Sequence, residues 1–505
     1  MRIQNQQKAG VLLSYINLGL GTIIPVFYTP IMLEIMGQAE YGLYALSHSV
    51  TAYLTLLNLG LSAAIGRYLA KCRAEGDIVG IRRLLGLFLV LYGCASTLVC
   101  VVGSGMTFLG DRLFEAGLTG SELERYRILV AIMTISVALS LPVSSFSAVI
   151  TTYERFAFIK TLGICETVLI PVFNLVVLYL GKGSVGLALV GLSVQIISGI
   201  IYVYYCAKRL KIWPSFHNLP TDLFRELAGY CIFVVIATLV DMLYWSTDKV
   251  LIGAMIGTVA VAVYNVGGVF TSILQNMAHA ISQVFTPRIM LMATKGERSN
   301  KEISELMVRV GRMQFYVVSF IVSGYIVFGK WFIRIWLGDG YDEAYYVALL
   351  TMIPLIIPLI QNVAFSTIMA QNKHRFRAIT YLVIAIVNVL STYLVLPYFG
   401  IIGAAVCTAV AFVLGNGLIM NIYYHRVIKL DIPGFWKSIL SVTFIPLLMS
   451  GAGYVVISKF RELDNVWVFL GGIVAYSLLF WLLSWFVSMN QSERQIFCSL
   501  VKRKR

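Results

Sequence analysis

The chain has 505 residues, of which 59% are hydrophobic and 12% are charged, and its formal net charge is +15. Soluble domains carry about 25% charged residues, so this composition excludes a soluble globular protein and indicates a membrane protein. Apolar runs of the roughly 20 residues that a helix needs to cross a bilayer recur along most of the chain. These runs lack the alternation of barrel strands, and we therefore predict an all-α polytopic membrane protein.

The predicted elements are about fourteen transmembrane helices, each an apolar run bounded by polar or charged residues. In chain order they cover residues 10–33, 41–70, 84–109, 126–150, 162–180, 184–207, 227–253, 258–287, 311–337, 343–370, 378–397, 401–425, 438–458 and 466–488. Most of the 39 lysines and arginines fall in alternate loops and at the two ends. By the positive-inside rule, both termini are expected in the cytoplasm, and the net charge needs no nucleic-acid partner to explain it.

An internal repeat at a shift near 220 residues is a second feature of the chain. "IMGQAEYGLYAL" (35–46) aligns with "MIGTVAVAVYNV" (255–266), and "GSVGLA" (183–188) aligns with "GIIGAA" (400–405). The repeat predicts two six-helix lobes of the same orientation, with a cavity between them that opens alternately to each side. The predicted parts are an N-terminal lobe (1–210), a cytoplasmic linker (211–226), a C-terminal lobe (227–428) and a last segment with two helices and a basic tail (429–505).

The motifs "EYGLYAL", "LNLGLSAAIGRYLA", "YERFAFIKTLGICETVLIPVFNL", "STDKVLIG" and "TIMAQNKHRFRAI" resemble those of the Wzx-type polysaccharide flippases. This family belongs to the MOP superfamily, with the lipid II flippases and the MATE exporters. The resemblance implies a MATE-like fold, the bacterial inner membrane, and translocation of an undecaprenyl-diphosphate-linked glycan to the outer leaflet for O-antigen, capsule or exopolysaccharide assembly. It also implies contact with membrane lipids and with a polysaccharide polymerase or chain-length machinery.

Three charged residues in the seventh predicted span are candidates for the lumen: Asp241, Asp248 and Lys249. Charges inside a membrane span rarely face lipid and often mark a transport pathway. In an unbroken helix, Asp241 and Asp248 would share one stripe because they are seven residues apart. The alternative is that Asp248 and Lys249 lie near the outer end of the span, where lysine can extend to the headgroups.

Polar residues in other spans are further candidates for binding the substrate. Gln275 and His279 are four residues apart, so they share a helix face suited to sugar hydroxyls, and His279 could carry a proton in a coupled cycle. Tyr28 and Asn58, together with His48, are weaker candidates. For all of them the alternative is hydrogen bonding between helices.

Two repeat-related arginines, Arg67 and Arg288, lie at the predicted cytoplasmic ends of the second and eighth spans. The guanidinium fork suits phosphate, so these residues could meet the diphosphate at the cytoplasmic entrance. The alternative is that they only set the orientation of the helices.

No motif predicts a cofactor, a metal site or a catalytic centre. "GKGSVG" (181–186) matches GxGxxG, but it joins two membrane spans and lacks the strand and helix context of a nucleotide site. We therefore predict a transporter, not an enzyme, driven by an ion gradient or by substrate flux. The alternatives are a MATE-like cation or drug antiporter and a membrane glycan polymerase, which the lack of a large outer loop disfavours.

Overall fold

The structure, a computed structural model, describes residues 3–58, 61–219, 223–293, 300–371, 373, 375–459, 466–491 and 493–495. The chain divides by its contacts into two compact units, Met1–Ala262 and Val263–Arg505. Part of the predicted linker (220–222) and most of the predicted basic tail (496–505) lie outside the described residues. The predicted division into lobes stays a prediction.

The described part of the chain is helical and contains no strand. Eleven of its helices are long and apolar enough to cross a membrane. The prediction of an all-α polytopic membrane protein is therefore confirmed.

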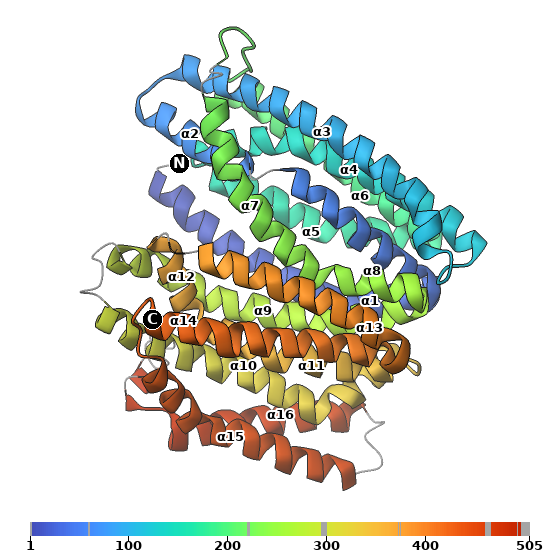
Figure 1. Cartoon of the computed structure of the whole chain (residues 1–505), viewed down its shortest axis with the longest axis vertical. Helices are drawn as coiled ribbons and strands as arrows, with labels where there is room; N and C mark the ends of the chain where they lie inside the picture. Colours follow the sequence, from blue (N-terminus) through green and yellow to red (C-terminus); the bar gives the residue numbers. More distant parts are fainter. Residues whose placement is uncertain are drawn as a thin grey trace. The chain divides into compact units, whose positions relative to one another are not determined.

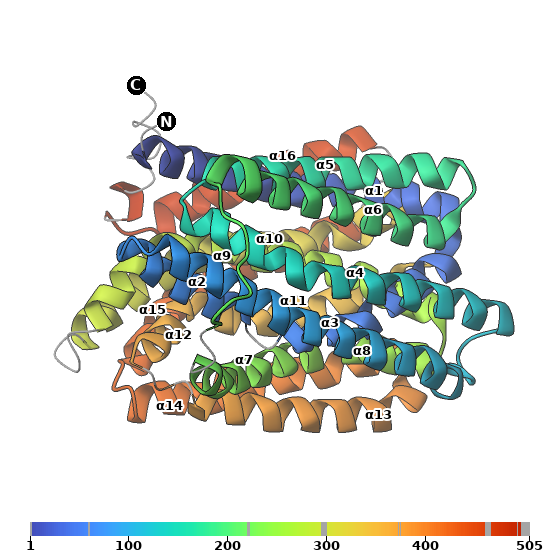
Figure 2. The same ribbon diagram turned by 90° about the horizontal axis from the view of Figure 1, so that it is seen from above.

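The first unit begins with the 50-residue helix α1. Its elements are α1 (Ile3–Ala52), the 3-10 helix η1 (Tyr53–Asn58), α2 (Leu61–Ala74), α3 (Ile78–Phe114), α4 (Gly120–Thr152), α5 (Phe156–Tyr179), α6 (Gly183–Tyr205), the π-helix η2 (Cys206–Leu210), α7 (Leu223–Trp245), α8 (Thr247–Met255) and the start of α9 (Thr258–Ala293). Helices α3, α4 and α6 run side by side in both views (Figures 1 and 2).

The second unit continues from α9. Its further elements are α10 (Asn300–Leu337), α11 (Asp342–Ile360), α12 (Asn362–Ala370), α13 (Arg375–Phe412), the π-helix η4 (Val413–Ile419), α14 (Met420–Arg426), α15 (Ile432–Lys459), α16 (Val466–Leu483) and the π-helix η5 (Ser484–Ser488). Helix α10 packs against α11, α15 and α16, and the core of this unit gathers around its buried side chains.

Two of the eleven long helices each cover two predicted spans. Helix α1 turns at Gly37 (φ 76°), and α13 turns at Gly400 (φ 58°). At such positive φ values glycine is the least strained residue. Helix α7 covers the first part of the seventh predicted span, and its apolar stretch Val234–Trp245 is shorter than the eleven. The count of fourteen stays a prediction.

Backbone geometry agrees at two positions that the predicted repeat aligns. Gly37 and Gly257 both have positive φ (76° and 124°), and so do Gly183 and Gly400 (54° and 58°). A true repeat would produce this match, because equivalent turns require equivalent dihedral angles. The repeat itself stays a prediction.

Helix α5 shows how lipid reverses the usual burial pattern. Its buried residues are Asn174 and Leu178, whereas Phe173 and Val176 are about half exposed. An apolar side chain loses nothing by facing lipid, but a polar one needs partners inside the protein. The apolar sequence of this helix is therefore consistent with a surface in contact with the bilayer.

Close backbone packing joins α8 and the start of α9 to the rest of the first unit. A Cβ atom at Gly42 of α1 would lie 1.8 Å from the carbonyl oxygen of Thr258, so only glycine fits there. The Thr258 hydroxyl donates a hydrogen bond to Glu122 Oε1 of α4 at 2.7 Å. These contacts hold α8 against α1, where the first candidate site lies.

Candidate functional site

The predicted single helix of residues 227–253 is interrupted in the structure, and this corrects the prediction. Helix α7 ends at Trp245, α8 begins at Thr247, and Ser246 between them has φ −113° and ψ −32°. The break places Asp248 in the first turn of α8. There the partial positive charge of the helix N-terminus favours a carboxylate. This charge helps to explain how the protein accommodates an aspartate that is only 1% exposed.

Polar side chains from α1 and η1 surround this first turn. The hydroxyls of Tyr53 and Thr247 form a hydrogen bond of 2.5 Å. Lys249 interacts electrostatically with Asp248 and with His48 of α1, and Tyr53 interacts with Asp248. We call these five residues (His48, Tyr53, Thr247, Asp248 and Lys249) the α8 polar cluster.

The side chains of the α8 polar cluster differ in charge and in exposure. Asp248 is buried, Lys249 is half-buried and His48 is exposed. The buried Asp248 carboxylate therefore neutralises the Lys249 ammonium group, and the Lys249 and His48 side chains remain accessible to a ligand. Such an arrangement can bind a polar or anionic group.

Asp241 lies on α7, before the break, and its side chain is exposed. The stripe predicted for Asp241 and Asp248 assumed one continuous helix. Because the helix is interrupted at Ser246, the spacing of seven residues does not place the two carboxylates in the same environment.

The other candidates of the first unit lie on separate elements. Tyr28 of α1 meets Asn174 of α5, and Asn58 is the last residue of η1, half-buried. Arg67 of α2 is exposed, with its guanidinium 6.0 Å from the ring centroid of the adjacent Tyr68. Their roles stay predictions.

The candidates of the second unit all lie on α9. Gln275 is half-buried, whereas His279 and Arg288 are exposed. The helix packs through other positions: Gln314 of α10 donates to the carbonyl oxygen of Ala278 at 3.1 Å. Gln275 and His279 therefore lie on one helix at the predicted spacing, and their contact with a substrate stays a prediction.

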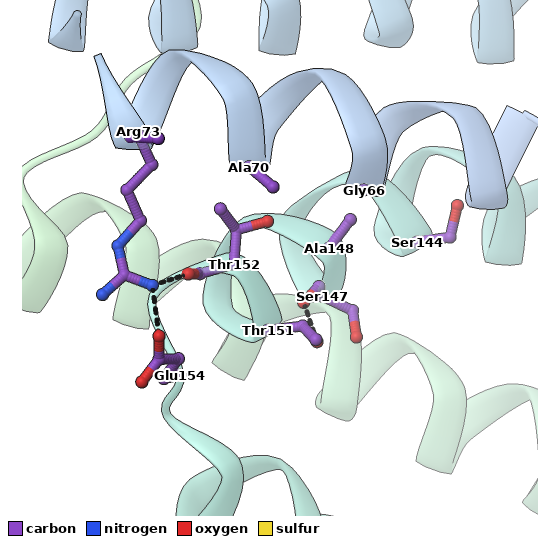
Figure 3. A pocket seen from close by; sticks show the side chains of 10 residues that line it. Gly66, Ala70, Arg73, Ser144, Ser147, Ala148, Thr151, Thr152 and Glu154 are labelled. Atoms are coloured by element: carbon purple, nitrogen blue, oxygen red, sulfur yellow. Dashed lines mark hydrogen bonds and ion pairs between the residues drawn. The ribbon is translucent and has the colours of Figure 1, made fainter. Parts of the chain in front are cut away.

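Sequence reasoning missed a cavity of about 770 Å³ between α2 and α4. It is lined by small residues, hydroxyl side chains and two charged residues (Figure 3). The lining consists of Gly66, Ala70, Arg73, Ala74, Ser144, Ser147, Ala148, Thr151, Thr152 and Glu154. We call this space the α2–α4 cavity.

An arginine and a glutamate close one end of the α2–α4 cavity. Nη1 of Arg73 donates to Glu154 Oε1 at 3.2 Å and to the carbonyl oxygen of Thr152 (Figure 3). The guanidinium carbon also lies 5.3 Å from the ring centroid of Tyr153. In the sequence, Arg73 is one of many basic loop residues, and Glu154 is part of the motif "YERFAFI". Nothing in either segment indicates that the two side chains meet.

A second arginine–glutamate pair lies in the second unit and is buried. Arg312 of α10 donates to both carboxylate oxygens of Glu493, from Nε at 2.5 Å and from Nη2 at 3.0 Å. The same guanidinium donates to the carbonyl oxygens of Ser438 and Ser488 at 3.2 and 3.0 Å. Nothing near Arg312 in the sequence indicates this pair, because Glu493 lies 181 residues away.

Comparison with known proteins places the chain in a family. Residues 8–292, more than half of the chain, match the family described as polysaccharide biosynthesis protein. A putative O-antigen transporter of Shigella flexneri is 19% identical over 77% of this chain and 91% of its own length.

Solved structures show the same fold. The lipid II flippase MurJ in an inward closed conformation matches with a TM-score of 0.72 at 14% identity, over 94% of this chain and 97% of the other. An inward-facing MATE multidrug transporter of the MOP superfamily matches with a TM-score of 0.59 at 15% identity, over 84% and 99%. These findings confirm the resemblance drawn from the motifs: the chain belongs to the polysaccharide biosynthesis protein family and has the fold of MOP superfamily transporters.

Proposed function

We propose that the protein is a flippase for a polyprenyl-diphosphate-linked oligosaccharide. It moves this lipid from the cytoplasmic to the outer leaflet of the bacterial inner membrane, for assembly of O-antigen, capsule or exopolysaccharide. It works by alternating access, without enzymatic chemistry, and both of its termini lie in the cytoplasm. The family match and the name of the Shigella flexneri relative support the substrate class.

The observation that carries this proposal is the α8 polar cluster, in which a buried carboxylate and a half-buried ammonium group meet at an interrupted membrane helix. Interrupted helices are typical of substrate sites in transporters, because the free helix end and its side chains can contact a polar ligand. Lys249 and His48 attract the diphosphate, and the hydrogen bond between the Tyr53 and Thr247 hydroxyls holds η1 against α8 beside them. The lipid tail stays in the bilayer, along the apolar outer surface.

An ion gradient supplies the energy in this proposal. His279 on α9 is the proposed proton carrier, because histidine is the side chain whose unperturbed pKa lies nearest neutrality. Transport in proteoliposomes should then collapse when an ionophore removes the gradient. Unchanged transport without a gradient would leave substrate flux as the driving force.

The proposal is tested by complementation of a strain from which the gene has been deleted. The wild-type chain should restore surface polysaccharide, whereas Lys249→Ala and Asp241→Ala should not, at equal protein levels on an immunoblot. Ser193→Ala is the matched control, because the exposed Ser193 hydroxyl bonds only the carbonyl of Leu189 in its own helix among the described contacts. Normal polysaccharide from both charge variants would overturn the assignment of these residues.

A cation or drug antiporter is the second candidate, and the MATE-like fold favours it. Such an exporter needs a predominantly acidic lumen, whereas the α8 polar cluster pairs its carboxylate with a lysine and a histidine. Drug resistance on expression, together with normal surface polysaccharide in the deletion strain, would show that the protein is an exporter and not a flippase.

A further inference from the structure

The α2–α4 cavity has a mixed lining of apolar and polar residues whose charges are balanced. Arg73 and Glu154 are its two charged residues, and they neutralise each other at 3.2 Å. Four lining side chains carry hydroxyls, and Gly66, Ala70, Ala74 and Ala148 leave room beside them. A volume of about 770 Å³ lies within the usual range of small-molecule sites, about 300–1,000 Å³.

Several hydroxyl oxygens of the cavity are arranged to accept hydrogen bonds from a ligand. The Ser144 hydroxyl donates to the carbonyl oxygen of Leu141 at 2.6 Å, and the Thr151 hydroxyl donates to that of Ser147 at 2.9 Å. Because their hydrogens are used within the helix, both oxygens offer lone pairs to the cavity. Glu154 Oε2 is buried and has no hydrogen-bond partner among the described residues.

Glu154 follows the end of α4 in a left-handed conformation, where the backbone N–H of Arg155 donates to the carbonyl oxygen of Ile150. Glu154 has φ 58° at the turn between α4 and α5, a left-handed conformation that usually selects glycine. A side chain there costs about 1–2 kcal/mol. Residues held in such conformations concentrate at functional sites, and here the carboxylate faces Arg73 and the cavity.

We propose that the α2–α4 cavity binds the sugar head of the lipid-linked substrate on the cytoplasmic side, before translocation. This inference rests on the proposed flippase function and its topology, which places the C-terminal ends of α2 and α4 in the cytoplasm. The cavity is a site for neutral sugar hydroxyls, separate from the α8 polar cluster that receives the diphosphate.

Charge decides between sugar and phosphate as the ligand. A diphosphate would meet the Glu154 carboxylate, and like charges in close contact repel. A sugar hydroxyl instead donates to a serine or threonine oxygen, and accepts from Arg73. Buried hydrogen-bonding groups of this kind discriminate strongly against a ligand that lacks the matching hydroxyl.

The test uses the purified full chain in detergent and two probes. One is the lipid-linked oligosaccharide extracted from the deletion strain, and the other is undecaprenyl diphosphate without sugar. Gly66→Leu fills the cavity, and because a Cβ at Gly66 has nothing within 4 Å, the helix should tolerate it. Gly93→Leu on α3 is the matched control, since its Cβ is equally free.

We expect Gly66→Leu to weaken binding of the lipid-linked oligosaccharide by about tenfold, or 1.4 kcal/mol, in a ligand-induced thermal-shift titration. Binding of undecaprenyl diphosphate should not change, and Gly93→Leu should match the wild type with both probes. Unchanged oligosaccharide binding by Gly66→Leu, or an equal loss with both probes, would overturn the sugar site. A wild-type chain that binds neither probe and restores no polysaccharide would instead overturn the proposed function.

Discussion

Two of the protein's arginine–glutamate pairs have different surroundings. Arg73 and Glu154 border an open cavity, and their side chains are 32% and 31% exposed. Arg312 and Glu493 lie inside the second unit, with side chains 9% and 4% exposed. The same two residue types therefore occur once where a ligand can reach them and once where the protein provides every contact.

This difference in burial predicts that the buried pair stabilises the fold and that the exposed pair can bind a ligand. An exposed ion pair contributes about 0–1 kcal/mol to stability, because water screens it and its side chains lose entropy. A buried pair is costly to break, since the remaining charge has neither water nor a partner. We infer that Arg312 holds α10, α15 and the segment after η5 together, whereas Arg73 and Glu154 are available for a ligand.

The largest expected effect is that of Arg312→Ala. Removing the guanidinium leaves the Glu493 carboxylate buried without its bidentate partner, and the carbonyls of Ser438 and Ser488 also lose a donor. The free energy of unfolding should fall by about 3–5 kcal/mol, measured by thermal or denaturant unfolding in detergent.

The matched control for this pair is the double variant Arg312→Met with Glu493→Leu. Apolar residues of similar volume often replace a buried ion pair without loss of stability, so this variant should unfold close to the wild type. If Arg312→Ala alone unfolds like the wild type, the pair does not hold these helices together.

Glu154→Gly should affect function strongly and stability little. The variant loses an exposed ion pair of at most about 1 kcal/mol and gains about as much by relieving the positive φ of Glu154. Surface polysaccharide in the complementation assay should fall sharply, while the unfolding midpoint stays near that of the wild type.

Lys211→Gly is the matched control, because Lys211 also has a positive φ, 56°, but is not part of the α2–α4 cavity lining. It should relieve the same strain and leave polysaccharide unchanged. Normal polysaccharide from Glu154→Gly would show that Glu154 only forms the turn and does not belong to the sugar site.

Arg73→Lys should have the smallest effect of the three. Lysine keeps the charge beside Glu154 but cannot donate in two directions from one planar group or stack on the Tyr153 ring in the same way. We expect a change in unfolding free energy below about 1 kcal/mol and a partial loss of polysaccharide. Complete loss, equal to that of Arg73→Ala, would show that the geometry of the guanidinium matters more than its charge.

Much of the fold could be predicted from the sequence. Composition and long apolar runs indicated an all-α membrane protein, and eleven helices of the described chain meet that requirement. The motifs indicated the family, and the match over residues 8–292 confirms it. Both signals are local, since each span must be apolar along its own length to enter a bilayer.

The candidate site could be predicted only in part. Charges within an apolar run mark Asp248 and Lys249, but hydropathy does not reveal the break at Ser246, because apolar residues resume directly after the short polar run 246–249. The contact of Tyr53 with Thr247 joins residues 194 positions apart. No periodicity of either segment indicates such a contact.

The sequence by itself determined that this chain crosses a membrane as apolar helices, because the bilayer selects for hydrophobicity in each segment separately. Only the tertiary structure decided which polar side chains meet. Arg73 reaches Glu154 across 81 positions and Arg312 reaches Glu493 across 181. Both arginines look alike in the sequence. The rotation and depth of packed helices, which depend on all their neighbours at once, make one of them half-exposed at a cavity and bury the other.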